Sequence, residues 1–340
     1  MNPAAFATGL GERIAFPDFA TLKAIDMLVG RTRRKLARAN HADTASFAEA
    51  MRNYPIAMHA DEANAQHYEV PAAFFETVLG PQRKYSCCLY DGAATLAEAE
   101  EAALAATAGY ANLTDGQRIL ELGCGWGSLS LWMARHFPGS RIVAVSNSHS
   151  QGAAIRERSA VEGLTNLEVL TADMNGFAVP GTFDRIVSVE MFEHMANWRP
   201  LLAKARAALN PDGRMYVHIF SHKSAAYRFD HTDPADWIAR HFFTGGIMPS
   251  HDLMREFGDL FAVEQEWRWS GKNYERTAAA WLDNFDRNAE TVEAILREVY
   301  GNEWRLWRRR WRLFFLATRG LFGHGDGSEW AVSHYQLAPV

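Results

Sequence analysis

A glycine-rich loop between two apolar segments most constrains the fold of this chain. Residues 118–122 and 142–145 have the composition of buried strands, and residues 129–136 between them have helical spacing. The loop after the first segment carries glycines at alternate positions, Gly123, Gly125 and Gly127. Such glycines can adopt positive φ and let a ligand approach the backbone amides without meeting a Cβ atom. The pattern predicts a strand–helix–strand unit with a cofactor site at its loop.

The ends of the next two strands indicate which cofactor this loop serves. A dinucleotide site would place an acidic residue after the second strand to bind the ribose hydroxyls. This chain has Asn147 there and Gln151 one turn later, so neutral amides would have to take that role. The third strand, 167–171, leads to Asp173, which could accept a hydrogen bond from an adenine amino group or serve as a helix cap. These features favour S-adenosylmethionine over a nicotinamide cofactor.

Two carboxylates and an imidazole follow the fourth predicted strand. The strand covers 183–189, and Glu190, Glu193 and His194 come directly after it. If a helical turn begins there, spacings of three and four residues put all three side chains on one face, at the sheet edge where ligands bind. A carboxylate beside an imidazole raises its basicity, which suits proton removal during group transfer. An acidic surface turn with a capping histidine would show the same pattern.

Composition narrows the class of protein. Hydrophobic residues make up 48% of the 340 residues, which is ample for a core. A formal net charge of -5 and a pI of about 6.2 leave no electrostatic footprint for nucleic acid. Three cysteines, two of them adjacent at Cys87 and Cys88, fit a reducing compartment better than a disulfide framework. With no secretion signal, membrane span or metal-ligand pattern in the sequence, we expect a cytoplasmic protein without a metal.

The order of the predicted elements divides the chain into four parts. We expect a helical cap over 1–90, a Rossmann-like cofactor-binding core over 91–220, a helical lid over 221–325 and a final core strand within 326–340. Beyond the elements above, the predictions are helices over 19–39, 44–51, 72–79 and 199–208 and strands over 214–220, 261–269 and 329–337. Alternating helices and strands predict an α/β fold with a mostly parallel sheet.

Five motifs in this order resemble the cyclopropane fatty acid synthase-like superfamily of methyltransferases, and most strongly its plant N-methyltransferases of the coclaurine (benzylisoquinoline) type. The motifs cover residues 67–71, 84–88, 121–127, 188–195 and 242–246, with a further match at 327–330. The resemblance runs from about residue 67 to the C-terminus and leaves the first sixty residues outside it. It implies a class I Rossmann-like methyltransferase with a seven-stranded mostly parallel sheet, an N-terminal helical cap and a C-terminal helical lid.

The resemblance also assigns roles to residues. The S-adenosylmethionine site of the family corresponds here to Ser86, Gly123, Asn147, Gln151, Asp173, Met174 and Val189, with Tyr85, Gly125 and Gly127 as extensions. Glu193 and His194 match the catalytic pair of the N-methyltransferases, and Glu190 matches a third acidic pocket residue. The amine pocket of those enzymes corresponds to Tyr68, Glu69, Trp311 and Phe314. This implies in-line methyl transfer to the nitrogen of a small aromatic or cyclic amine, with S-adenosylhomocysteine as the second product.

A cyclopropane-fatty-acyl-phospholipid synthase is the alternative enzyme. There, methyl transfer to an alkene leaves a carbocation, and a bound bicarbonate removes the proton that closes the ring. Positions resembling that bicarbonate site are Cys87, Glu193, His218 and Tyr274, which inherited core packing would also explain. The lipid synthases typically carry glycine where this chain has Glu190. A carboxylate there suits a cationic amine better than an apolar acyl chain.

Segment 304–315 separates the amine interpretation from the lipid one. Its aromatic residues are spaced by three and four with five arginines between them. That pattern suits a helix on a membrane surface, or a helix packed over the pocket with its arginines in solvent, which the acidic chain favours. We expect a small-molecule amine as partner and membrane contact only under the lipid interpretation; a homodimer stays open. A non-catalytic protein that keeps the cofactor as a structural ligand is the remaining alternative, against which the intact acid–base cluster argues.

Overall fold

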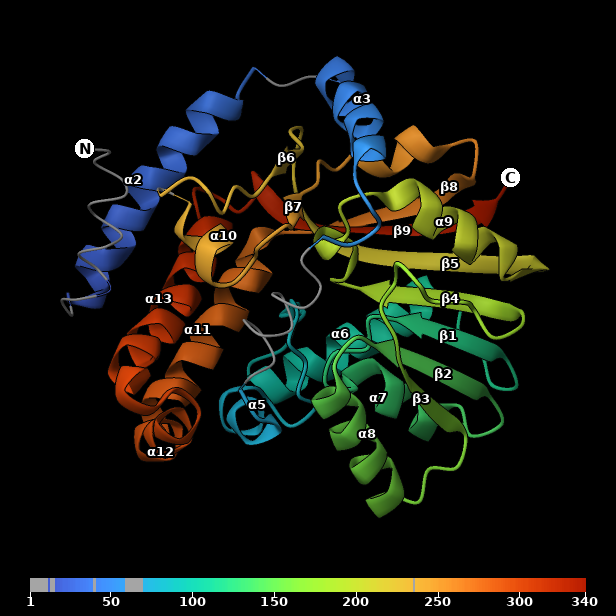
Figure 1. Cartoon of the computed structure of the whole chain (residues 1–340), viewed down its shortest axis with the longest axis horizontal. Helices are drawn as coiled ribbons and strands as arrows, with labels where there is room; N and C mark the ends of the chain where they lie inside the picture. Colours follow the sequence, from blue (N-terminus) through green and yellow to red (C-terminus); the bar gives the residue numbers. More distant parts are fainter. Residues whose placement is uncertain (1–11, 13–15, 39–40, 59–69, 235) are drawn as a thin grey trace.

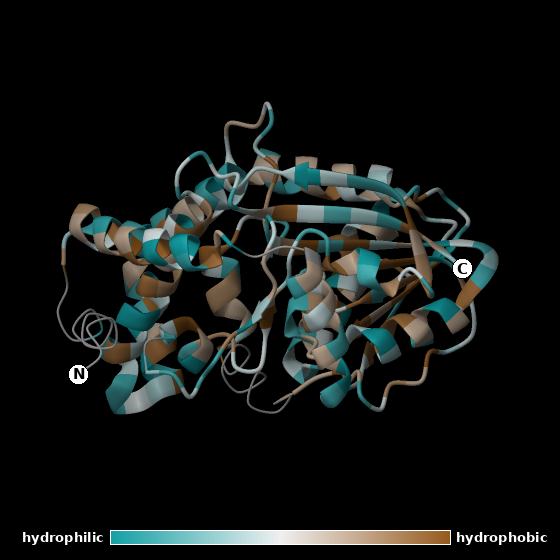
Figure 2. Ribbon diagram, turned by 90° about the horizontal axis from the view of Figure 1, so that it is seen from above, coloured by the Kyte–Doolittle hydropathy of each residue, from teal (hydrophilic) through white to brown (hydrophobic). Residues whose placement is uncertain are grey.

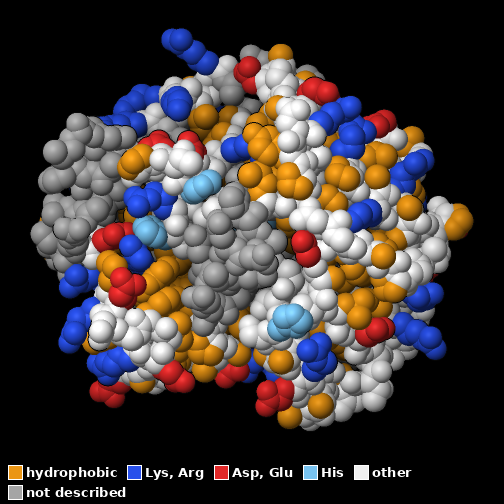
Figure 3. All heavy atoms as spheres, viewed as in Figure 1, with side chains coloured by type: hydrophobic (Ala, Val, Ile, Leu, Met, Phe, Trp, Pro, Cys, Tyr) orange, Lys and Arg blue, Asp and Glu red, His pale blue; other side chains and the backbone are white. Residues whose placement is uncertain are grey.

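The computed structural model describes residue 12 and residues 16–38, 41–58, 70–234 and 236–340 (Figure 1). A seven-stranded sheet forms one part of the molecule. A layer of helices lies beyond one end of its strands (Figure 1). The space-filling view shows positive and negative side chains interspersed over the described part of this face (Figure 3).

The sheet consists of β1 (Arg118–Leu122), β2 (Arg141–Ser146), β3 (Leu167–Thr171), β4 (Phe183–Val189), β5 (Leu209–His222), β8 (Phe261–Trp269) and β9 (Trp330–Pro339). Its strand order is β3-β2-β1-β4-β5-β9-β8. The first five strands in that order are parallel, and β9 is antiparallel to both β5 and β8. The predicted fold class, an α/β protein with a seven-stranded mostly parallel sheet, is therefore confirmed.

Helices cover both faces of the sheet. They are α3 (His41–Ala50), α6 (Leu96–Tyr110), α7 (Ser128–His136), α8 (His149–Val161) and α9 (Trp198–Ala207), with the short η1 (Met51–Asn53) and η3 (Leu253–Phe257). Adjacent residues of β1 serve opposite faces, as strand geometry requires. Ile119 packs in a cluster with α6 and α7, whereas Leu120 packs with Trp198 and Leu202 of α9. The near-continuous burial of β1 follows from this double coverage.

The helical layer is built around aromatic side chains. It contains α2 (Asp18–Leu36), α5 (Ala72–Val78), α10 (Trp237–His241), α11 (Gly271–Arg287), α12 (Ala289–Tyr300) and α13 (Trp304–Phe322), with the short η4 (Gly301–Glu303). Trp281 of α11 and Trp311 and Phe315 of α13 are fully buried in one cluster with Phe74 and Phe75 of α5. Figure 2 shows that apolar segments of these helices turn inward while their hydrophilic segments lie outside. Burial of this aromatic surface stabilises the layer against the sheet.

Two local features differ from the sequence-based expectation. The strand predicted over 214–220 begins earlier, because Leu209 already pairs with Phe183 and the register shifts before Arg185 pairs with Arg214. A two-stranded sheet of β6 (Tyr227–Arg228) and β7 (Ile247–Met248) lies within the lid region. Strands of two residues carry too little alternation for a periodicity argument to find them.

Candidate active site

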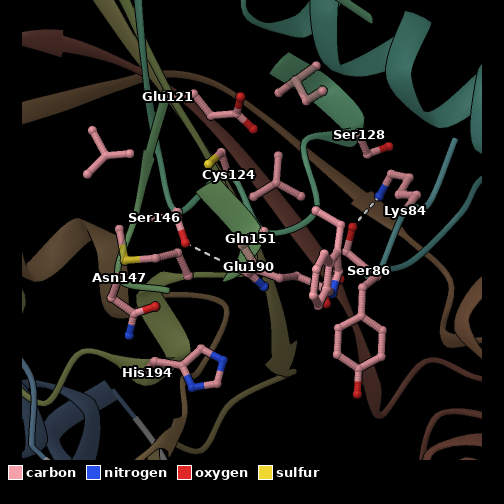
Figure 4. Close-up of a pocket in the computed structure, with 18 of the residues that line it drawn as sticks. Lys84, Ser86, Glu121, Cys124, Ser128, Ser146, Asn147, Gln151, Glu190 and His194 are labelled. Carbon is pink, nitrogen blue, oxygen red and sulfur yellow. Dashed lines mark hydrogen bonds between the residues drawn. The ribbon is translucent and has the colours of Figure 1, made fainter. Parts of the chain in front are cut away.

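A cavity of about 180 Å³ lies at the carboxyl ends of β1 to β4 and extends toward α11 and α13 (Figure 4). Parallel strands bring their carboxyl ends to one edge, so residues far apart in the chain meet there. The residues named from the sequence that line it are Tyr85, Ser86, Gly123, Gly125, Asn147, Gln151, Asp173, Met174, Val189, Glu190, His194, Tyr274 and Phe314. The structure therefore brings most of the sequence-derived site together.

The three loop glycines are needed for different reasons. Gly123 has φ 79°, and an added Cβ would lie only 2.4–2.5 Å from the side chain of Met191. Gly125 has φ 51° and lines the cavity, with open space where a Cβ would project. Gly127, which precedes α7, does not line the cavity; its missing side chain makes room for Ile155. Two of the three predicted cofactor glycines thus face the cavity, and the third is a packing position.

The ends of β2 and β3 supply the polar groups that the sequence predicted. The Ser146 hydroxyl donates to Oε1 of Gln151 at 2.7 Å, which fixes the amide beside the cavity (Figure 4). Gln151 Nε2 is buried and has no hydrogen-bond partner among the described residues. Asp173 also lines the cavity, and its Oδ1 accepts from the backbone N–H of Asn175 at 3.0 Å. Asp173 therefore organises its own turn while facing the cavity, and the predicted alternative of a helix cap is replaced by this turn.

Lys84 is a buried cation beside the site. Only 2% of it is exposed, and its Nζ donates to Oγ of Ser86 at 2.5 Å and to the carbonyl of Cys87 at 2.7 Å. Its backbone N–H donates to Oε1 of Glu100 at 3.1 Å. A buried ammonium needs such partners because desolvation is costly. These contacts hold loop 84–87 in place, with Lys84 and Ser86 across the cavity from Asn147 and His194 (Figure 4).

The Glu190 carboxylate is the centre of a buried hydrogen-bond network. Its Oε1 lies 2.9 Å from the backbone N–H of Cys87 and 3.2 Å from Nε2 of His218, and its Oε2 accepts from the Tyr274 hydroxyl at 2.7 Å. The backbone of Glu190 has φ 47°, which is uncommon for a residue other than glycine and typical of functional sites. Burial raises the pKa of Glu190, while the charge of Lys84 and the hydrogen bonds oppose that rise.

Glu193 and His194 occupy η2 (Phe192–His194), and they point differently. Glu193 is fully buried, its Oε1 accepts from the backbone N–H of Phe220 at 2.6 Å, and it does not line the cavity. Burial, and then the charge of Glu190, raises its pKa well above the usual value. His194 lines the cavity and stacks on Phe243 at 4.4 Å between ring centroids. The prediction that all three side chains share one face is wrong for Glu193, because the helical turn covers only 192–194 and Glu190, with φ 47°, lies outside it.

Burial gives His194 an unusual proton affinity. Removal from solvent lowers the pKa of its imidazole to about 4, against an upward effect from the Glu190 charge. The ring is therefore neutral near pH 7 and has one nitrogen that can accept a proton. A neutral imidazole at the cavity wall can accept a proton, and the Glu190 charge favours the protonated form against the desolvation that makes the ring a weak base.

Aromatic side chains form the wall opposite the strand ends. The aromatic lining residues beyond loop 83–86 and the glycine loop are Phe220, Phe243, Tyr274, Trp281 and Phe314. Trp311, predicted to line the amine pocket, is fully buried behind this wall, against Phe74 at 4.7 Å and Phe242 at 5.1 Å between ring centroids. Tyr68 and Glu69, the other predicted pocket residues, lie outside the described residues.

Several arginines of α13 form ion pairs. Arg312 contacts Asp18 of α2 at 2.6 Å and Asp286 of α11 at 2.8 Å, and Arg310 lies 3.2 Å from Glu12. The expectation of arginines in solvent is thus wrong for Arg310 and Arg312, because N-terminal acidic residues reach this helix, whereas Arg305 is exposed as expected. Over the described ranges, no helix is long and apolar enough to cross a membrane.

Several lining residues were not in the sequence-derived site, namely Lys84, Glu121, Trp126, Ser128, Phe220, Phe243 and Trp281. Glu121 and Trp126 belong to the glycine motif, and Lys84 precedes Tyr85, so adjacency would have found them. Trp281 lies seven residues after Tyr274 on α11, which is two helical turns and the same face. Phe243 belongs to the motif over 242–246, whereas Phe220 carries no sequence signal that separates it from core aromatics.

The cavity fits S-adenosylmethionine. Three buried donors that line it have no hydrogen-bond partner in the part of the chain that the structure describes, Trp126 Nε1, Ser128 Oγ and Gln151 Nε2. Buried donors of this kind need acceptors, which the carboxylate, hydroxyl and ring nitrogens of the cofactor provide. Gly125 leaves the backbone open to close approach. The glycine loop, the polar strand ends and the three buried donors together provide the contacts that such a ligand requires.

Comparisons with known proteins agree with this geometry. The chain matches the mycolic acid cyclopropane synthetase family over residues 57–320. It is 35% identical over 328 residues to (S)-coclaurine N-methyltransferase of Thalictrum flavum subsp. glaucum, which covers 94% of this chain and 91% of that one. It is 30% identical over 269 residues to the cyclopropane-fatty-acyl-phospholipid synthase of Escherichia coli K12, which covers 78% of this chain and 66% of that one.

A solved structure supports the same relationship to the coclaurine N-methyltransferases. The crystal structure of a coclaurine N-methyltransferase bound to N-methylheliamine and S-adenosylhomocysteine has a TM-score of 0.91 and 32% identity, and the match covers 95% of both chains. With that coverage, most of the first sixty residues take part in the match. The expectation that they fall outside the resemblance is therefore wrong, because the motif comparison found only the strongly patterned segments.

Proposed function

The chain belongs to the mycolic acid cyclopropane synthetase family and is an S-adenosylmethionine-dependent methyltransferase, and on this premise we propose that it methylates the nitrogen of a small aromatic or cyclic amine. S-adenosylmethionine, when bound, supplies a methyl group made electrophilic by the positive sulfur. The residues of this chain then have three tasks: to hold the amine, to take its proton and to keep water out.

The position of the Glu190 carboxylate carries the proposal. It is buried at the cavity, and its two oxygens accept from Cys87 N–H and the Tyr274 hydroxyl. A protonated amine is a cation that can pair with this carboxylate, and aromatic faces such as those of Phe314 and Trp281 attract cations as well. An acyl chain would bring no charge to the same carboxylate, so that only Lys84 and the hydrogen bonds would offset its desolvation.

His194 is the proton acceptor in this proposal. An amine that is protonated at neutral pH has no lone pair with which to attack, so the proton must leave first. The neutral His194 ring lines the cavity and can take the proton at its unprotonated nitrogen; its pKa of about 4 then favours rapid release. Glu193 is buried off the cavity with a raised pKa, so we assign it a supporting role behind Phe220 rather than proton removal.

Glu190 also bears on the lipid alternative. The backbone N–H of Cys87, the His218 ring and the Tyr274 hydroxyl, which resembled a bicarbonate site, all contact the Glu190 carboxylate. A side-chain carboxylate that already uses these groups competes with a bound bicarbonate for them. The identity to the Escherichia coli synthase still makes lipid the correct second arm of a test.

The test is a methyl-transfer assay with labelled S-adenosylmethionine on two panels. One contains cyclic aromatic amines, starting with the unmethylated parent of N-methylheliamine, and the other contains unsaturated phospholipid vesicles with and without bicarbonate. We expect methylated amine that does not depend on bicarbonate. Bicarbonate-dependent methylation of lipid, with no amine product, would overturn the proposal.

Glu190→Gln sharpens the test. The change keeps the shape and removes the charge, so kcat/KM for the amine should fall roughly a hundredfold, the scale for removing one partner of a buried charge pair. The affinity for S-adenosylhomocysteine, measured by calorimetry, should stay within about threefold. The matched control is Glu168→Gln on an exposed position of β3, which should change neither quantity.

A further inference from the structure

Two fully buried histidines lie side by side behind Glu190. His218 of β5 and His334 of β9 are direct cross-strand partners, and their ring centroids are 4.5 Å apart. His218 Nε2 faces Glu190 Oε1 at 3.2 Å, and His334 Nδ1 lies 2.7 Å from the hydroxyl of Tyr216. The other nitrogen of each ring, His218 Nδ1 and His334 Nε2, is buried without a hydrogen-bond partner among the described residues. Buried polar atoms rarely lack a hydrogen-bond partner, and these two belong to neighbouring rings.

The tautomers follow from the outer contacts. Burial lowers the pKa of both rings well below the usual value, so each ring is neutral, with one N–H donor and one acceptor nitrogen. An ionised Glu190 carboxylate can only accept, which makes His218 Nε2 the donor and His218 Nδ1 the acceptor. With the Tyr216 hydroxyl as the donor to His334 Nδ1, the proton of His334 lies on Nε2. The two unsatisfied nitrogens are thus one donor and one acceptor.

We propose that Tyr216 and His334 are positioning residues that fix the tautomer of His218, so that its Nε2–H donates to Glu190 and keeps that carboxylate ionised and oriented toward the amine. The ring centroids are 4.5 Å apart, and a rearrangement of the rings that joins the two unsatisfied nitrogens directs every donor in the line Tyr216–His334–His218 toward Glu190. This inference rests on the proposed function, because Glu190 is the group proposed to hold the amine. It assigns a role to two residues that do not line the cavity.

The side chains around Glu190 and the two histidine rings limit which other groups can replace the line Tyr216–His334–His218. The titratable and charged side chains around Glu190 and the two rings are Lys84, Cys87, Glu193, His194, Tyr274 and Tyr110. Lys84 contributes charge but donates to Ser86 and Cys87, and Trp269 packs against both rings and donates to Tyr110 at 3.4 Å. Among the described side chains, only Tyr216 hydrogen-bonds to His334. Removal of the Tyr216 hydroxyl should therefore release the ring.

The test compares Tyr216→Phe with Tyr335→Phe. Both change a buried tyrosine on the central strands, but the Tyr335 hydroxyl donates to the carbonyl of His251 and not to the line. Nitrogen-15 spectra of the histidine rings report the tautomers directly, with His218→Asn and His334→Gln to assign the signals. In the native protein we expect both rings to be protonated on Nε2. Tyr216→Phe should abolish the fixed tautomer of His334, and Tyr335→Phe should leave it.

The second readout is the pH profile of kcat/KM. If the line keeps Glu190 ionised, Tyr216→Phe moves the acidic limb upward by roughly half to one pH unit, the shift expected from one neutral hydrogen bond. Equal shifts in Tyr216→Phe and Tyr335→Phe, or a native His218 protonated on Nδ1, would overturn the inference. The spectra need no substrate, so they decide this inference even where the amine assay fails. A failed amine assay with the expected tautomers rejects the proposed function alone.

Discussion

The cofactor side and the acceptor side of the cavity are assembled in different ways. The cofactor side consists of short loops that follow β1, β2 and β3, and its key contacts, such as that between Ser146 and Gln151, join residues close in sequence. The acceptor side depends on contacts across the chain: Glu190 meets Cys87, His218 and Tyr274, which come from a loop, a strand and a helix. Local chemistry fixes the first side, and global packing fixes the second.

The largest expected effect comes from a substitution on the acceptor side of the cavity. His194→Ala removes the proposed proton acceptor and should lower kcat about 10²- to 10⁴-fold, the range for general acid–base groups. The affinity for S-adenosylhomocysteine should change little, because His194 does not belong to the strand-end loops of the cofactor side. Steady-state kinetics and calorimetry on the same preparation measure the two. Equal losses of turnover and cofactor affinity would contradict the division into two sides.

The next effect concerns pH and the buried ring. The folded pKa of His194 is about 4, below its usual 6.5, so the unfolded chain binds a proton between these values and the folded protein does not. The free energy of unfolding therefore falls as pH drops from 7 to 5, by about 2 kcal/mol from this group. The raised pKa values of Glu190 and Glu193 act in the opposite direction, since the folded state there binds more protons.

Comparison with His194→Gln isolates the histidine contribution. The variant cannot bind the proton in either state, so its unfolding free energy should fall less over the same range. Denaturant unfolding at pH 7 and pH 5 measures the difference. An identical fall in both proteins would mean that the ring of His194 is solvated and titrates normally.

The same contrast explains what could be predicted from the sequence. β1, β3, β4 and β8 have the predicted residues, and Asn147, Gln151 and Asp173 line the cavity as their strand ends required. Glu190 and His194 line the cavity, whereas Glu193 does not, because Glu190 lies outside the turn at 192–194 and the backbone N–H of Phe220 holds the Glu193 carboxylate. Trp311 was assigned to the pocket wall, yet the packing of α5 and α10 places it behind Phe314.

A glycine comparison sharpens the cofactor side, with a smaller effect. Gly123→Ala puts a side chain at φ 79° and against Met191, so we expect a loss of about 1–2 kcal/mol in unfolding free energy from the backbone strain and weaker cofactor binding from the displaced loop. Gly116→Ala is the matched control, with φ 87° and no atom within 4 Å of the added Cβ. It should lose only the stability due to the backbone conformation, less than Gly123→Ala, and bind S-adenosylhomocysteine as the native protein does. Unchanged binding in Gly123→Ala would contradict the cofactor role of this loop.

The smallest expected effect tests whether the N-terminal helix α2 belongs to the acceptor side. Arg312 joins α13, which carries Phe314, to Asp18 of α2 and Asp286 of α11, and it is only 26% exposed. Arg312→Met keeps the packing of the stem and removes both ion pairs, which should cost about 0.5–1 kcal/mol. Arg297→Met, which removes a more exposed pair on α12, should cost less. If the amine KM stays constant while the melting temperature falls, α2 braces the layer from outside; a raised KM at unchanged stability would make the N-terminal helix part of the acceptor side.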